Sequence, residues 1–300
     1  MTAAVPEGRF VIDGPTADCA VVQVWANDYI RFESLPAWQK HVRDEIRSRS
    51  RQLEPEAGQV LHATFCGAKL PNADVENLVI YNIDTFRVAG RNGIRFEYGD
   101  LMPPAPQGDE HRFYYRYALA SRSDTLTHWN KGRVLASFDW TDLGAFKAEK
   151  QLAQVWWALW RGEAQAFFPA IAPNTPFGVR IEIRVPHHRQ PQPVWGGWVK
   201  GVVDGVICAF QTHTDTAVLS EVAERLARIL PAQPEEIAGY LRDERRAVLG
   251  ARPRLVSPYQ LGVKWDPDDH FCVAGELLAA KPAAVEEGWA IKGEIFELSR

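Results

Sequence analysis

The sequence predicts an α+β protein built from two tandem units that pair as a pseudo-dimer, with a helical insertion in the second unit. Two observations predict this class. The chain of 300 residues is 46% hydrophobic and 24% charged, which is typical of a globular protein. Along it, β-rich runs alternate with amphipathic helical patterns, and the same order of elements occurs twice. We place the first unit in residues 1–125, the second in 126–300, and the insertion in 215–254.

In the first unit, Leu35, Trp38, Val42 and Ile46 recur at three- and four-residue spacing, which predicts an amphipathic helix. Runs of β-branched and aromatic residues on either side of it predict strands. The expected elements, in chain order, are a strand at 20–25, a helix at 34–51, a strand at 59–66, a helix at 74–84 and two strands at 93–98 and 113–119.

The second unit repeats this order. Its expected elements are a strand at 133–140, a helix at 146–160, a strand at 178–185, a helix at 198–206 and two strands at 271–278 and 289–298. The insertion at 215–254 precedes the last two strands and contains two helical patterns separated by Pro231 and Pro234. Two such units can pair as identical subunits do, each having a sheet with helices on one face.

Composition and missing motifs exclude several function classes. A net charge of -4 and a pI near 6.1 argue against nucleic-acid binding through bulk positive charge, although a local basic patch remains compatible. The four cysteines show no zinc or disulfide spacing, so we expect reduced, buried thiols. No apolar run is long enough to span a membrane, and we expect a cytoplasmic protein. Motifs for dinucleotide binding, nucleotide hydrolysis, zinc proteolysis and α/β-hydrolase chemistry do not occur.

The sharpest local motif is Asp74-x-Glu76-Asn77-Leu78, followed by Asp84. Three carboxylates close to one helix start suit Mg²⁺ or Mn²⁺, because these ions prefer hard oxygen ligands. Asn77 and Asp84 are seven residues apart and share a helix face, so the set could converge on a metal and a phosphate. The same residue types are also typical of helix capping, since Asp favours the N-cap and Glu the first turn. Spacing alone leaves both interpretations open.

The segment from Asp74 to Asp84 resembles the Asp-x-Asp-Asn-Leu-x-Lys-x-x-x-Asp motif of the RusA-type Holliday junction resolvases, with Glu76 for the second Asp and Ile80 in place of the lysine. The preceding strand and Pro-containing loop fit as well. Members of that family are small homodimeric α/β magnesium-dependent endonucleases whose acidic residues gather near the dimer interface. The resemblance implies that Asp74, Glu76 and Asp84 are catalytic metal ligands, that Asn77 supports them, and that branched DNA is the partner.

The second unit carries the later part of the same motif. Lys200 and Asp204 match it, whereas Val194 and Gly196 replace the two acidic residues. The resemblance implies that Lys200 crosses the pseudo-dimer interface to act as a catalytic residue, supplying the charge that Ile80 cannot.

Asp268 and Asp269 resemble the acidic pair that opens the family's next strand, separated here from the helix by the insertion. With Asp204, they are the second unit's candidates for the site. Each has a commoner use, however. Lys200 and Asp204 are typical of an ordinary i,i+4 surface pair, and Asp268 and Asp269 are typical of a turn before a strand.

Basic and aromatic residues give weaker signals for nucleic-acid binding. The candidate phosphate contacts are Arg47, Arg49, Arg51, Arg245 and Arg246. Neighbouring acidic residues favour a solvated helix face for them instead. The tryptophans that could stack on bases are Trp156, Trp157, Trp160, Trp195 and Trp198. Their positions on apolar helix faces favour packing. We expect the adjacent His187 and His188 to be exposed loop residues.

Two functions fit these observations. The first is a metal-dependent endonuclease-like protein that hydrolyses phosphodiesters in branched or structured DNA, using Mg²⁺ or Mn²⁺. The second is a catalytically inactive binding or assembly module on the same duplicated scaffold, which the incomplete motifs and the acidic net charge favour. In both cases we expect a monomer that acts as a pseudo-dimer, or a homodimer.

Overall fold

The first half of the chain forms its elements in the predicted order. The computed structural model describes residues 9–31, 34–68, 74–83, 89–106, 108, 110–147, 150–186, 198–280 and 288–300. The elements of the first half are β1 (Phe10–Asp13), β2 (Val21–Ala26), α1 (Ala37–Ser50), β3 (Gln59–Gly67), α2 (Val75–Ile80), β4 (Gly93–Gly99) and β5 (Phe113–Ser121). The sequence does not predict β1, which pairs antiparallel with β2. The second helix is shorter than expected, because α2 ends at Ile80.

The second half also follows the predicted order, with several short additions. Its main elements are β6 (Asn130–Gly144), α3 (Gln151–Arg161), β8 (Phe177–Arg184), α4 (Val199–Ala209), β13 (Cys272–Ala279) and β14 (Trp289–Ser299). The insertion holds the two predicted helices, α5 (Leu219–Ala227) and α6 (Pro234–Leu241). The short elements are β7 (Gln165–Ala166), β9 (Thr212–His213), η4 (Glu244–Arg246), β10 (Ala251–Arg252), β11 (Val256–Tyr259), β12 (Gly262–Trp265) and η5 (Asp269–Phe271). The hairpin of β11 and β12 extends the insertion beyond residue 254.

The strands of both halves form one sheet, which corrects the expectation of a separate sheet in each unit. Ten strands lie in the order β1-β2-β5-β3-β4-β13-β8-β14-β6-β7. β4 and β13 pair antiparallel where the two halves meet, with Arg95 opposite Glu276. Their side chains form a buried ion pair at 2.5 Å. Backbone hydrogen bonds and a buried charge pair therefore join the halves.

On each side of this junction the strands have the same order of neighbours. From the junction outward, the order is β4, β3, β5, β2 in one half and β13, β8, β14, β6 in the other. In both series the first pair is parallel and the next two are antiparallel. Since α2 follows β3 and α4 follows β8, these two helices hold equivalent places in the order of elements.

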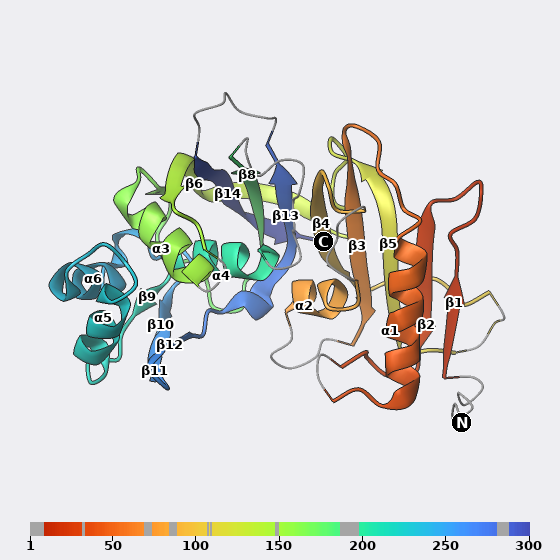
Figure 1. Ribbon diagram of the computed structural model, residues 1–300, viewed down its shortest axis with the longest axis horizontal. Coiled ribbons are helices and arrows are strands. Elements are labelled where there is room, and N and C mark those ends of the chain that lie inside the picture. Colours follow the sequence, from red (N-terminus) through yellow and green to blue (C-terminus); the bar gives the residue numbers. More distant parts are fainter. Residues whose placement is uncertain are drawn as a thin grey trace.

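The helices α1 to α4 lie on one side of the sheet in Figure 1, with α5 and α6 at the far end of the second half. The hydrophobic core fills the space between these helices and the sheet. Trp156, Trp157 and Trp160 of α3 are buried in it, which confirms packing as their role. Trp198 is half-buried and packs edge-on against Trp289, with ring centroids 4.7 Å apart. The prediction for Trp195 lies outside the described residues.

Two further expectations concern cysteines and membranes. All four cysteines are free, and Cys66, Cys208 and Cys272 are buried as expected. Cys19 is exposed, which corrects the expectation for that thiol, because it lies in a turn before β2 rather than in a core strand. Within the described ranges, no helix combines the length and the apolar character that a membrane crossing requires.

Candidate metal centre

Residues from both halves meet around the ammonium group of Lys200. Its Nζ lies 2.7 Å from Asp74 Oδ2, 3.3 Å from Glu76 Oε1, 3.2 Å from Asp204 Oδ2 and 3.3 Å from Asp269 Oδ2. We call these four acidic residues the carboxylate cluster. Asp74 and Glu76 come from the start of α2, Lys200 and Asp204 from α4, and Asp269 from the first position of η5. The structure thus brings together five of the candidates named from the sequence.

Asp74 occupies the N-cap position of α2, but its side chain makes no capping hydrogen bond. Its carboxylate accepts hydrogen bonds from Asn77 Nδ2 and from Lys200 instead. Asp74 therefore occupies the position of a helix cap, but its side chain does not perform the capping role. Asn77, one turn into the helix, orients this carboxylate, as a supporting residue would.

Two oxygens of the carboxylate cluster are buried without a hydrogen-bond partner among the described residues. They are Glu76 Oε2 and Asp204 Oδ1. The Glu76 side chain is only 1% exposed and that of Asp204 6% exposed, so solvent does not compensate for them. Buried polar atoms are nearly always paired, because an unpaired one costs about 1–3 kcal/mol, more when the group is charged. These oxygens are therefore suited to a ligand that brings positive charge.

The charges in the cluster do not balance. Burial raises the pKa of Asp204 to about 6 and, together with Asp74 and Asp204, that of Asp269 to about 7. Burial also raises the pKa of Glu76 well above its ordinary value, although Lys200 opposes the rise. For Lys200, burial alone would lower the pKa, but the surrounding carboxylates raise it, so the ammonium stays charged. One ammonium cannot neutralise four carboxylates, so the cluster must hold protons or a further cation.

Three members of the cluster have the geometry to hold a metal ion. One carboxylate oxygen from each of Asp74, Glu76 and Asp269 lies within 4.8 Å of the other two. Carboxylate oxygens are the donors that Mg²⁺ and Mn²⁺ prefer. The Lys200 side chain is 40% exposed and that of Asp269 15%, so the cluster is open to solvent on one side. An ion could enter by that side.

The other candidates from the sequence lie elsewhere or cannot be placed. Asp84, His187, His188, Val194 and Gly196 fall outside the described residues. Ile80, where the resemblance expects lysine, is a buried apolar residue at the end of α2. Asp268 adjoins the cluster, and its carboxylate accepts hydrogen bonds from Arg252 and Gln211 rather than from Lys200.

Most of the candidate arginines contact their own protein. Arg49 pairs with Glu45 and donates to Gly14 O, and Arg47 donates to Tyr81 O at 3.4 Å. Arg246 donates to Leu159 O at 2.8 Å, which ties η4 to the end of α3. Arg245 pairs with Asp243 on the surface. Arg51 is exposed directly after α1.

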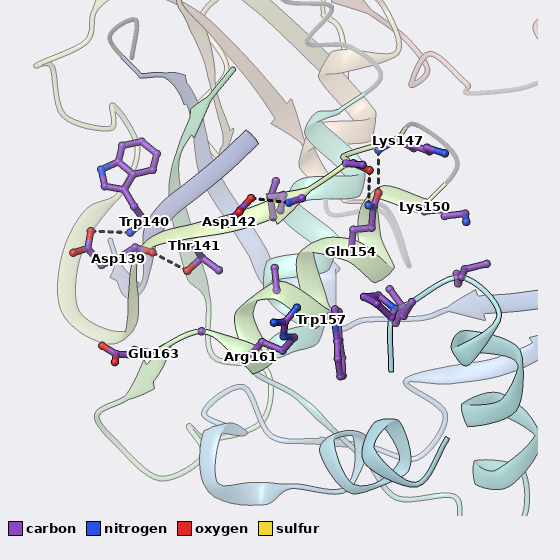
Figure 2. Close-up of a pocket in the computed structure, with 18 residues that line it drawn as sticks. Asp139, Trp140, Thr141, Asp142, Lys147, Lys150, Gln154, Trp157, Arg161 and Glu163 are labelled. Atoms are coloured by element: carbon purple, nitrogen blue, oxygen red, sulfur yellow. Dashed lines mark hydrogen bonds between the residues drawn. The ribbon is translucent and has the colours of Figure 1, made fainter. Parts of the chain in front are cut away.

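A cavity of about 740 Å³ lies away from the cluster, between the end of β6, α3 and the segment after α5. Figure 2 shows that polar side chains lining it bind nearby backbone groups. Asp139 and Asp142 accept hydrogen bonds from backbone N–H groups of β6, and Gln154 of α3 donates to Ala145 O. None of the residues lining it belongs to the carboxylate cluster. The cavity therefore adds nothing to the chemistry of the cluster.

Neither Gln211 nor Arg252 is among the candidate site residues predicted from the sequence. Both residues approach Asp268 through the fold of the insertion, so no local pattern marks them.

Comparison with known proteins adds no assignment: no protein-family model, curated protein or solved structure matches this chain.

Proposed function

We propose that this protein is a RusA-like, divalent-metal-dependent endonuclease that acts on branched or structured DNA by phosphodiester hydrolysis. One observation carries the proposal. Asp74 and Glu76 from the start of α2 and Asp269 of η5 place carboxylate oxygens within 4.8 Å of one another, beside two buried oxygens that have no hydrogen-bond partner among the described residues. Gathering like charges in a buried place costs free energy, and Lys200 offsets only part of that cost, so the arrangement is suited to a bound cation.

The proposal includes an internal duplication that makes the chain a pseudo-dimer. It is supported by the equal order of strands outward from the β4–β13 junction and by the equivalent places of α2 and α4. The two copies of the motif are complementary: the first supplies Asp74 and Glu76, and the second supplies Lys200 and Asp269. Together they form one composite centre, with Lys200 reaching carboxylates of the other half at 2.7 and 3.3 Å.

Each residue has a distinct role in this centre. Asp74, Glu76 and Asp269 would hold Mg²⁺ or Mn²⁺, which activates water and neutralises charge on the scissile phosphate. Asn77 keeps the Asp74 carboxylate oriented through its hydrogen bond. Asp204 holds Lys200 one turn away on α4. Lys200 supplies a permanent positive charge beside the ligands, suited to the developing negative charge on a phosphate.

A second function is favoured by one observation. The Lys200 ammonium already contacts all four carboxylates, so it partly neutralises them without any metal. A chain that had lost catalysis could keep this arrangement as a structural ion cluster. The second candidate is therefore a catalytically inactive binding or assembly module on the same scaffold.

Metal binding separates the two functions. Titration calorimetry with Mn²⁺ should give one site per chain, lost in Asp74→Asn. Asp44→Asn is the matched control, since Asp44 is an exposed residue paired with Lys40 on α1. A nicking assay on a labelled four-way junction with Mg²⁺ or Mn²⁺, run beside a gel-shift assay in Ca²⁺, then tests the reaction.

Each outcome decides between the candidates. Single-site binding and nicking, both lost in Asp74→Asn and kept in Asp44→Asn, support the endonuclease. The resemblance implies Asp84 as a further metal ligand, and on that basis we expect Asp84→Asn to abolish nicking. The double variant with Asp74→Asn should show no further loss, because metal ligands act as a unit. Junction binding without nicking in every metal supports the inactive module. If the chain neither binds nor nicks the junction, the nucleic-acid proposal is overturned.

A further inference from the structure

Asp268, the residue before Asp269, is held by Arg252 of the insertion and by Gln211, which precedes the insertion. It occupies the N-cap position of η5, but its side chain makes no capping hydrogen bond. Its carboxylate accepts hydrogen bonds from Arg252 Nη1 and, at 3.4 Å, from Gln211 Nε2. The backbone N–H of Asp268 donates to Gln211 Oε1 at 3.3 Å. Both the backbone and the side chain of this residue are therefore fixed.

Arg252 spans the whole turn that leads to Asp269. Besides its bond to Asp268, its Nε donates to Asp266 O and its Nη2 to Asp266 Oδ2, both at 2.8 Å. A planar guanidinium can hold several acceptors in one fixed geometry, which an ammonium cannot. The side chain of Arg252 is 27% exposed, and Gln211 is 1% exposed. The contact of Arg252 with Asp268 is thus half-buried, whereas Gln211 anchors Asp268 from the interior.

The residues between α4 and the insertion link this turn to the helix that carries Lys200. Gln211 lies two residues after the end of α4. The next two residues form β9, which pairs parallel with β10, so that His213 lies opposite Arg252. Lys200 and Asp269 are therefore connected in two ways. They form an ion pair directly, and they are linked through α4, Gln211 and the hydrogen bonds between Gln211 and Asp268. A change in the Arg252 contacts would alter the position of Asp269 relative to Lys200.

We propose that Arg252 is a positioning residue of the metal centre: by clamping Asp266 and Asp268 it fixes the backbone that presents Asp269 to Lys200 and to a divalent cation. The inference rests on the proposed function for its metal, while the clamp itself is a feature of the insertion. Arg252 also neutralises Asp268, which keeps a fifth carboxylate charge from adding to the four of the cluster. The insertion is thereby an integral part of the centre.

Mn²⁺ affinity, measured by calorimetry on the full chain, tests the clamp. Arg252→Gln should weaken Mn²⁺ binding roughly 10- to 100-fold, as loss of an outer partner of a metal ligand does. Arg252→Lys should give an intermediate loss, since it keeps the charge but cannot span both aspartates. Arg254→Gln is the matched control: Arg254 is 71% exposed, pairs with Asp215, and lies two residues away. Thermal melts check that each variant is folded.

Two further measurements separate positioning from general effects. In an Asp268→Asn background, Arg252→Gln should weaken Mn²⁺ binding less than it does in the wild-type chain, because residues acting through one another are not additive. Hydrogen exchange of the peptide 266–271, measured without metal, should quicken in Arg252→Gln and stay unchanged in Arg254→Gln.

The outcomes distinguish this inference from the proposed function. Unchanged Mn²⁺ affinity in Arg252→Gln, or an equal loss in Arg254→Gln, overturns the positioning role. If the wild-type chain binds no Mn²⁺, the proposed function fails, and the exchange measurement alone judges the clamp: slower or equal exchange in Arg252→Gln overturns it. If Arg252→Gln does not fold, Arg252→Lys against Arg254→Gln decides by the same criteria.

Discussion

Glu97 on β4 is the clearest single residue at which pH and stability are linked. Its side chain is fully buried, and its carboxylate lies 2.6 Å from His62 Nε2. The backbone N–H groups of Thr127 and His128 also donate to it, at 3.1 and 3.0 Å. Burial would raise the pKa of Glu97, but these hydrogen bonds outweigh it and lower the pKa from 4.5 to about 2.

A depressed carboxyl pKa makes the protein less stable in acid. The contribution of Glu97 is fully present above pH 4.5 and is lost as the pH falls toward 2, because the unfolded chain takes up the proton first. The size of the effect is on the order of 3 kcal/mol. Urea unfolding at steps between pH 5 and 2.5 should show that the free energy of unfolding falls as the pH falls, and Glu97→Gln should flatten this slope. The same substitution at exposed Glu224 controls for the loss of one carboxylate. An unchanged slope in Glu97→Gln would contradict the assignment.

Lys200 gives a prediction that separates a metal centre from a structural ion cluster. Lys200→Ala leaves four carboxylates without their cation, so the free energy of unfolding in EDTA should fall by about 1–3 kcal/mol. This is less than for a fully buried pair, since the lysine is 40% exposed. Mn²⁺ should restore that stability and bind at least as tightly as to the wild-type chain, because the ammonium no longer competes for Asp74 Oδ2. Urea unfolding with and without Mn²⁺ measures both effects. A loss that Mn²⁺ does not reverse would favour the structural cluster.

At the scale of elements, the position of α4 depends on its close approach to α3. A Cβ at Gly205 would lie 2.7 Å from Val155 Cβ and 2.9 Å from Leu152 O, and one at Gly201 would lie 2.6 Å from Gln151 Oε1. These distances are shorter than atoms can tolerate, and at Gly205 one of the neighbours is backbone. The two glycines therefore allow α4 to lie where Lys200 and Asp204 reach the cluster.

Gly205→Ala should force α4 away from α3. We expect a loss of about 1–3 kcal/mol in the free energy of unfolding, as for other overpacked cores. Gly239→Ala on α6 is the matched control, since a Cβ there meets nothing within 4 Å. It should stabilise the chain by up to about 1 kcal/mol through helix propensity. Thermal unfolding compares the two variants, and equal stability of Gly205→Ala and the wild type would contradict the packing argument.

Most large elements could be predicted from the sequence because their patterns are local. Alternation marks β8, and three- and four-residue spacing marks α1. The strand β1 could not be recognised in the same way, since it has four residues and depends on pairing with β2. The short strands β9 and β10 likewise exist only because the two ends of the insertion meet. Such elements are products of tertiary structure rather than of local preference.

The candidate site was predictable in its residues but not in its geometry. Spacing could not choose between an i,i+4 surface pair and a composite centre for Lys200, because the decisive neighbours Asp74 and Asp269 lie 126 and 69 residues away. The single sheet was unpredictable for the same reason. Pairing of β4 with β13 joins residues about 180 apart, such as Arg95 and Glu276, and no local pattern specifies such a pair.

At the scale of the whole molecule, the proposed pseudo-dimer contains one full set of carboxylates and one lysine within a single chain. Asp74 and Lys200 contact each other inside that chain, so a second copy is not needed to complete the centre. A symmetric pair of cuts would require two centres and hence two chains. We therefore expect one chain to nick a branched DNA on a single strand.

Mixing variants tests whether the centre belongs to one chain. Asp74→Asn and Lys200→Ala each remove one contributor to the same centre, so each alone should abolish or strongly reduce nicking of a labelled four-way junction. If the centre forms within a chain, an equimolar mixture of the two variants stays as inactive as either one, since neither chain holds both residues. If the centre forms between chains, as in a domain-swapped or true homodimer, a fraction of the mixed dimers combines an intact Asp74 with an intact Lys200, and nicking returns. Wild type diluted with Asp74→Asn provides the calibration, because nicking in proportion to the wild-type fraction is the result expected of independent centres. Recovery of activity in the mixture would therefore contradict the intrachain centre and indicate one that forms across an interface between two chains.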